Sequence, residues 1–180
     1  RHGDMGIEWI WLRIRCEKGW LNLCNLYLPP MSAILGPAKY LVDQINDFIG
    51  REGSMGCLLT GDFNCLLLEP GEVLNVEGGV SSTYVKRGCY WQRLFASCRY
   101  PPAILNRLDL VPTHVFNGGS SVIDYVIWFG SSAGIVKHFK IVGGFADHNM
   151  LTAELQVDLV PIEYIPRINY GRLLYHPDQR

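Results

Sequence analysis

The sequence has no C-x-x-C pair, no long apolar run and no excess of charge of either sign. Its six cysteines occur singly, which argues against a zinc ribbon or a thioredoxin-type site. No apolar run reaches the roughly 18–20 residues of a transmembrane helix, so we expect no contact with a membrane. The formal net charge is -1, from 16 Lys and Arg against 17 Asp and Glu, which excludes a strongly basic nucleic-acid-binding chain but not a local basic groove.

Two common catalytic motifs are also missing. The sequence has no G-x-S-x-G elbow, which disfavours a serine nucleophile of the hydrolase type. It has no G-x-x-x-x-G-K-[ST] loop, which disfavours hydrolysis of nucleotide triphosphates.

What is present is enough apolar side chain for one folded domain. Hydrophobic residues make up 48% of the 180 positions and charged residues 18%, which excludes a disordered chain. Most cysteines lie within apolar runs, so we interpret them as small buried hydrophobic residues in a reduced, intracellular compartment, nuclear or cytoplasmic. The cysteines are Cys16, Cys24, Cys57, Cys65, Cys89 and Cys98.

Hydrophobic periodicity predicts both strands and helices. Alternation predicts a hairpin of strands 7–15 and 21–28, with Gly19 in the turn. Further strands are predicted at 57–60, 122–128, 136–142 and 150–157, and helices at 36–50 and 90–98. Residues 66–88 lack periodicity and are interpreted as a long loop. The fold class is therefore α+β or α/β, with sheets packed between helices.

Three polar clusters lie at the ends of these strands. Asp62 and Asn64, two residues apart on an extended segment, point to the same side and can hold a water and a divalent cation; spacing alone favours a simple turn. Asp124 interrupts an apolar strand and needs a partner, for which a histidine is suited, unless it meets water at the strand end.

The third cluster is the adjacent pair Asp147 and His148. His148 can donate to a phosphate oxygen while a carboxylate such as Asp124 holds its tautomer; the alternative is a solvated surface turn. Strand ends of one sheet meet at a common edge, and three acids, an amide and a histidine at one edge suit metal-assisted phosphoester cleavage.

Four short motifs follow one another along the chain: Tyr27-Leu28-Pro29, Gly61-Asp62-Phe63-Asn64, Ser121-Val122-Ile123-Asp124-Tyr125 and Ala146-Asp147-His148. Their order resembles that of the endonuclease/exonuclease/phosphatase superfamily. Within it, the motifs look most like the apurinic-type endonuclease domain of non-LTR (LINE-type) retrotransposons, from about residue 7 to residue 157. This resemblance implies a layered α/β sandwich of two mixed β-sheets flanked by helices.

The resemblance also implies a role for each matching residue. Asp62 would orient or deprotonate the attacking water, and Asn64 would hold that water, the phosphate or a metal. His148 would stabilise the developing charge on the phosphate, with Asp124 orienting its ring. Asp147 would lie in the metal and leaving-group region.

Two further residues match family positions. Tyr27 would contact the phosphate or leaving group, and Thr113 resembles a phosphate-contacting threonine. The implied ion is Mg²⁺ or Mn²⁺, with Asp62, Asn64 and Asp147 as the ligands expected from this chain. Four arginines between the end of the long loop and the third cluster could contact phosphates: Arg87, at the end of the loop itself, and Arg93, Arg99 and Arg107.

The sequence also departs from the family pattern. Ala146 stands where the family usually has Ser, and Val122 where it commonly has Arg. The two first strands of the family, which carry an Asn and a metal-binding Glu, have no counterpart before residue 7. We therefore expect an N-terminally truncated domain over residues 1–157 and a tail or linker over 158–180.

Three function classes follow from these observations. The first is a metal-dependent endonuclease that nicks target DNA, with very weak or no activity in this chain because the Glu is missing. The second is a superfamily phosphatase or phosphodiesterase acting on lipid or small-molecule phosphoesters. The third is a non-catalytic, nuclease-like binding module. The missing strands would leave an open sheet edge, which predicts a homodimer formed by edge pairing.

Overall fold

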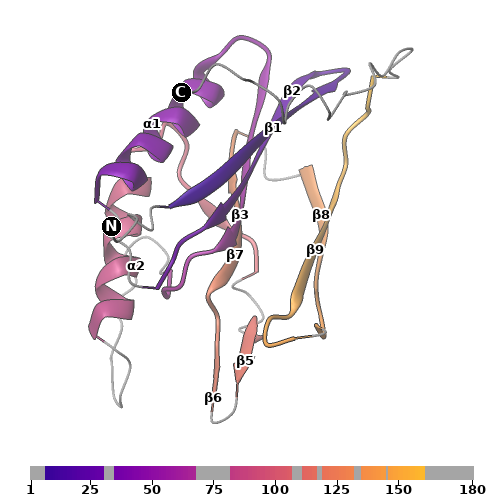
Figure 1. Cartoon of the computed structure of the whole chain (residues 1–180). Coiled ribbons are helices and arrows are strands. Elements are labelled where there is room, and N and C mark those ends of the chain that lie inside the picture. Colours follow the sequence, from indigo (N-terminus) through magenta and orange to yellow (C-terminus); the bar gives the residue numbers. More distant parts are fainter. Residues whose placement is uncertain are drawn as a thin grey trace, which may run out of the picture.

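The computed structural model describes residues 7–30, 35–67, 82–106, 111–116, 119–131, 135–144 and 146–160. Within these ranges it is an α+β fold (Figure 1). The helices are α1 (Leu35–Gly50) and α2 (Ser82–Phe95). The strands are β1 (Glu8–Cys16), β2 (Gly19–Tyr27), β3 (Ser54–Asp62), β4 (Ala103–Ile104), β5 (His114–Phe116), β6 (Gly119–Ser121), β7 (Asp124–Phe129), β8 (Val136–Val142) and β9 (Met150–Leu155).

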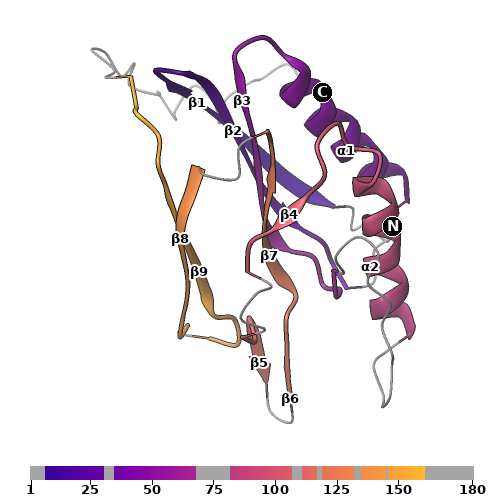
Figure 2. The same cartoon turned by 180° about the vertical axis from the view of Figure 1, so that it is seen from behind.

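A mixed five-stranded sheet forms the centre of the molecule, in the order β1-β2-β3-β7-β4. The β2–β3 pair is parallel, with α1 as the crossover, and the other pairs are antiparallel. Strands β5 and β6 form a separate ribbon, and β8 and β9 form a second, antiparallel sheet. Figures 1 and 2 show β8 and β9 on the side of the main sheet away from the helices, and the β5–β6 ribbon beyond the lower end of β7.

Both helices cover one face of the main sheet. Their buried apolar stripes, including Leu41 and Ile45 of α1 and Trp91 of α2, pack with Leu59 and Ile127 of the sheet in one hydrophobic core. Burial of these side chains is the main stabilising term for this layer.

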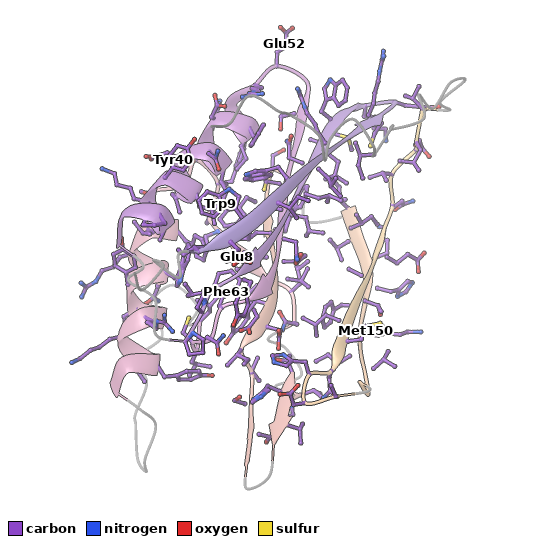
Figure 3. The ribbon with its side chains drawn as sticks, in the orientation of Figure 1. Glu8, Trp9, Tyr40, Glu52, Phe63 and Met150 are labelled. Carbon is purple, nitrogen blue, oxygen red and sulfur yellow. The ribbon has the colours of Figure 1, made fainter. Side chains whose placement is uncertain are left out.

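The β1 strand joins this core through its tryptophans. Trp9 and Trp11 each donate an indole N–H to Oε1 of Gln44 on α1, both at 3.1 Å. Figure 3 shows Trp9 lying toward Tyr40 of α1, and the two ring centroids are 6.2 Å apart. The alternation predicted for this strand is therefore correct, and its aromatic face is the helix-covered one.

The opposite face packs against β8 and β9. Leu21, Leu58, Val126 and Trp128 of the main sheet form a second core, against which Phe139 and other side chains of the small sheet pack. The architecture is thus three layers: helices, main sheet and small sheet. The sheet of β8 and β9 has two antiparallel strands among the described residues, so of the two sheets that pack face to face only the main sheet is mixed.

Most predicted elements are found close to their predicted bounds, and β8 has the predicted bounds. The loop interpretation of residues 66–88 is wrong at its end, because α2 already begins at Ser82. The short strands β4, β5 and β6 were not predicted. Residues 68–81, within the expected loop, lie outside the described residues.

The segment expected as a tail begins with ordered contacts. The Glu17 amide donates to the Asp158 carbonyl at 2.8 Å, and Cys16 forms a β-bridge with Leu159. Residues 161–180 lie outside the described part of the chain. In that described part, neither helix is long and apolar enough to cross a membrane.

The six cysteines are all free thiols, and four of them are buried. Burial raises the pKa of the Cys24 thiol to about 12, which keeps it neutral at physiological pH. These four residues act as small apolar side chains, as predicted from their positions in apolar runs.

Candidate active site

One end of the main sheet carries a polar row across three strands. Tyr27 of β2 is in register with Asp62 of β3, and Asp62 is in register with Asp124 of β7. Register partners on neighbouring strands lie about 5 Å apart and point to the same face. Their alternation with Leu58 and Val126 places this row on the face that the small sheet covers. The two acids were predicted to meet at one edge, and the strand register brings them together.

The end of β3 is shaped by two special backbone positions. Gly61 has φ +138°, and a Cβ there would lie 1.9 Å from the Leu26 carbonyl oxygen, so the backbone can approach β2 this closely only with glycine. Asn64 has φ 45°, a left-handed conformation that asparagine tolerates.

Asn64 closes a turn back onto Asp62. Its amide N–H donates to Asp62 Oδ1 at 2.8 Å, and its side-chain Nδ2 donates to Asp62 Oδ2 and to the Leu28 carbonyl, each at 2.9 Å. The simple turn that the spacing of Asp62 and Asn64 favours is therefore present. The same turn holds the Asp62 carboxylate beside Asp124, so the two residues can form both a turn and part of a site.

Asp124 has the histidine partner that its place in an apolar strand required. Its two carboxylate oxygens lie 3.2 and 3.0 Å from Nδ1 of His148, and the Asp124 side chain is only 14% exposed. With the Nδ1–H donated to the carboxylate, Nε2 is the ring atom left for a ligand. This pairing is the arrangement expected if Asp124 orients the His148 ring.

Two buried side chains hold Asp124 in place. Oγ1 of Thr113 accepts from the amides of Ile123 and Asp124, both at 3.0 Å. Nδ2 of Asn106 donates to the Asp124 carbonyl at 2.8 Å. Thr113 is 0% exposed, so the contact that the structure shows is with the backbone of the site; its phosphate contact stays a prediction.

The environment of Asp62 raises the pKa of its carboxyl group above the usual value. Burial is the largest cause, and the negative charge of Asp124 adds to it. The Asn64 amide hydrogen bond and the charges of His148 and His114 act in the opposite direction. A carboxylate with a raised pKa is a stronger base, which suits proton abstraction from a water.

His114 is a site residue that the sequence reasoning missed. It lies against His148, with ring centroids 4.7 Å apart, and its Nε2 is 3.7 Å from Oδ2 of Asp147. The only local indication that His114 belongs to the site is its place next to Thr113. Its contact with Asp147 depends on pairing between distant segments, which the sequence pattern does not show. Asp147 therefore lies near the site, facing His114 rather than Asp62.

Tyr27 and the predicted phosphate-contacting arginines differ in how accessible they are to a ligand. Tyr27 is 45% exposed at the edge of the polar row, where a ligand can reach it. Arg87 is buried and donates to the Pro29 carbonyl at 2.7 Å, so it supports the loop after β2 instead of facing solvent. Arg107 lies outside the described residues.

The acids of the site suit a divalent cation. Asp62, Asp124 and His148 each offer a ligand atom within 4.8 Å of the others. Two carboxylates this close repel each other, and a hard cation such as Mg²⁺ or Mn²⁺ between them would relieve that repulsion. The geometry brings Asp62 together with Asp124, whereas the predicted ligand Asp147 belongs to a neighbouring group with His114 and His148.

Among the comparisons with known proteins, the likeness to one solved structure bears on the fold. No protein-family model matches the sequence, and no curated protein matches it either. The endonuclease domain of TRAS1, a telomere-specific non-LTR retrotransposon, superimposes with a TM-score of 0.63 at 17% identity, covering 82% of this chain and 63% of that one.

A second solved structure is similar over 81% of this chain and 51% of its own: CdtB, the biologically active subunit of cytolethal distending toxin, with a TM-score of 0.42 and 16% identity. This chain thus spans less than two thirds of the TRAS1 domain. Its likeness to that domain shows that this chain shares its α+β fold.

Proposed function

We propose that this chain is part of a DNA endonuclease domain of the LINE-type retrotransposon kind and cleaves phosphodiesters with Mg²⁺ or Mn²⁺. The observation that carries the proposal is the Asp124–His148 pair beside Asp62, on a fold shared with such a domain. A hydrogen-bonded acid–imidazole pair next to a second, more basic carboxylate supplies the groups that phosphoester hydrolysis needs.

In this proposal Asp62 and His148 do different work. Asp62, with its raised pKa, takes the proton of the attacking water, and Asn64 holds the carboxylate in position. His148 donates from Nε2 to a phosphate oxygen, because Asp124 occupies Nδ1. Tyr27, at the exposed end of the row, contacts the phosphate or the leaving group.

A divalent ion, held by Asp62 and Asp124 with the predicted Asn64 and Asp147 nearby, would supply Lewis-acid stabilisation of the phosphate charge. The family's metal-binding Glu has no counterpart in this sequence. The proposal therefore includes very weak cleavage by the 180-residue chain alone.

The test is a plasmid-nicking assay on the purified chain with Mg²⁺ or Mn²⁺, run beside a binding assay on an oligonucleotide. We expect weak, ion-dependent nicking that is lost in His148→Ala and kept in His138→Ala, since His138 is exposed on β8. Strong nicking with Mg²⁺ that is lost in Asp62→Ala would confirm the nuclease and contradict the expected weakness. DNA binding with no cleavage, even at high Mn²⁺, would favour the non-catalytic binding module.

A further inference from the structure

A second cluster of ligand atoms lies beside the proposed phosphate site. His114, Asp147 and His148 each offer a ligand atom within 4.8 Å of the others. Nε2 of His114 faces Oδ2 of Asp147 at 3.7 Å, and the two imidazole rings lie 4.7 Å apart at an angle of 52°. The proposed hydrolysis gives His114 no role, so this grouping needs its own explanation.

The backbone holds the two histidines opposite each other. His114 and His148 form an antiparallel β-bridge. The Val115 amide donates to the Asp147 carbonyl, and the Asn149 amide donates to the Thr113 carbonyl, both at 2.7 Å. A site built on paired backbone segments is preorganised, because its side chains start from fixed Cα positions.

The Nδ1 atom of each of the two histidines has a hydrogen-bonding partner, as metal-binding histidines usually do. Nδ1 of His148 meets the Asp124 carboxylate at 3.0 Å, and Nδ1 of His114 lies 3.4 Å from Oγ of Ser121. The carboxylate holds the ring orientation and the tautomer of His148, and the Ser121 hydroxyl is compatible with an Nε2 of His114 that is presented to an ion. For His114, this is the nitrogen that faces Asp147.

The cluster is open enough for an ion and its water to enter. The side chains of His114, His148 and Asp147 are 21%, 38% and 61% exposed. Ligand atoms around a tetrahedral zinc ion lie roughly 3.4 Å apart, so the 3.7 Å between His114 and Asp147 needs only a small closing movement. The exposed Asp147 side chain can make that movement.

The donor types select the class of ion. Two imidazoles and one carboxylate suit zinc and its transition-metal neighbours, whereas Mg²⁺ and Ca²⁺ favour sites made of oxygen. We propose that His114, Asp147 and His148 bind a zinc-class divalent ion, with water completing its coordination. This site is separate from the Mg²⁺ or Mn²⁺ expected at Asp62 and Asp124.

The position of the site has a consequence that rests on the proposed function. An ion bound to Nε2 of His148 withholds that nitrogen from the phosphate. Zinc is therefore expected to inhibit nicking, and removal of the His114 ligand should weaken the inhibition while leaving the Asp124–His148 pair in place.

The test is a titration of the metal-free full chain with Co²⁺ followed by visible absorption, and with Zn²⁺ followed by calorimetry, both without DNA. We expect one tight site per chain, weakened roughly tenfold or more in His114→Gln and in Asp147→Asn. The matched control His138→Gln should bind as the wild type does. Circular dichroism and melting curves show whether each variant is folded, and the exposed Asp147 gives a variant that does not disturb packing.

Two results would overturn the site: unchanged affinity in folded His114→Gln and Asp147→Asn, or a thiolate-to-cobalt charge-transfer band showing that cysteines hold the ion. Because the titration uses no DNA, a failure of the nuclease proposal leaves its result intact. If nicking is observed, Zn²⁺ inhibition that persists unchanged in His114→Gln would contradict the inhibitory role alone.

Discussion

In the antiparallel ladder of β3 and β7, Asp62 lies directly opposite Asp124. The two carboxylates share a partly buried position at the end of the sheet, with the His148 ring on one side and the Asn64 turn on the other. Burial and the neighbouring charge make it harder for Asp62 to ionise, and the turn and the imidazole partly offset this.

Replacing Asp124 by Asn tests whether the orientation of the His148 ring matters for cleavage, because the variant keeps His148 itself. The variant keeps the shape of the side chain and loses the charge that holds the imidazole in position. We expect the nicking rate to fall about a hundredfold or more. Asp43→Asn, on the exposed side of α1, is the control and should leave the rate unchanged. Equal rates in the two variants would count against the role of Asp124.

The raised pKa of Asp62 predicts a pH-dependent stability. Because the pKa is higher in the folded than in the unfolded chain, the contribution of this group to stability is full below the ordinary carboxyl pKa and is lost as pH rises through the folded pKa. The wild type should therefore lose stability relative to Asp62→Asn as pH rises from acid toward neutral.

Urea unfolding of both proteins across this pH range measures the difference. The informative quantity is the change in the free-energy gap with pH, since the Asn side chain also alters the hydrogen bonds with Asn64. A gap that stays constant with pH would show that the Asp62 carboxyl group has an ordinary pKa.

Thr113→Val should destabilise the fold although the two side chains have similar shapes. The valine leaves the buried amide of Ile123 and the partly buried amide of Asp124 without their acceptor, which should cost about 2 kcal/mol in free energy of unfolding. Thr113→Ser keeps both hydrogen bonds and loses one methyl group, for a smaller cost of about 1 kcal/mol. Chemical denaturation measures both, and an equal loss in the two variants would contradict the importance of the oxygen.

We predict a homodimer that forms by pairing along β1, the strand at one edge of the main sheet. Ile10 and Leu12 on this strand are 61% and 58% exposed, which is high for apolar side chains next to an open sheet edge. We expect light scattering to give a dimeric mass that Leu12→Lys converts to a monomer. Lys39→Ala, a change on the surface of α1, serves as the control. A monomeric mass for the wild-type chain would rule out the dimer.

Local patterns in the sequence predict most of the long elements. Strand β8, Val136–Val142, has the bounds that its alternation predicts. Helix α2 was predicted too short because Gly88 was read as a loop residue. In the structure a Cβ at Gly88 would lie 1.8 Å from the Leu66 carbonyl oxygen, so this glycine reflects close packing of two segments and not a break in the helix. Strands such as β5, of three residues, are too short for periodicity to show.

Hydrophobic patterns along the chain predict where the long strands lie, and with them the three acids, the amide and His148 that stand near their ends. Which of these side chains meet depends on how the strands pair in the folded molecule. Asp62 faces Asp124, and His114 faces His148, through ladders and bridges between segments far apart in the chain. Register between such segments depends on how both faces of the sheet are buried at once, and a shift by one residue would send every side chain to the opposite face. No local pattern of hydrophobic residues contains that information.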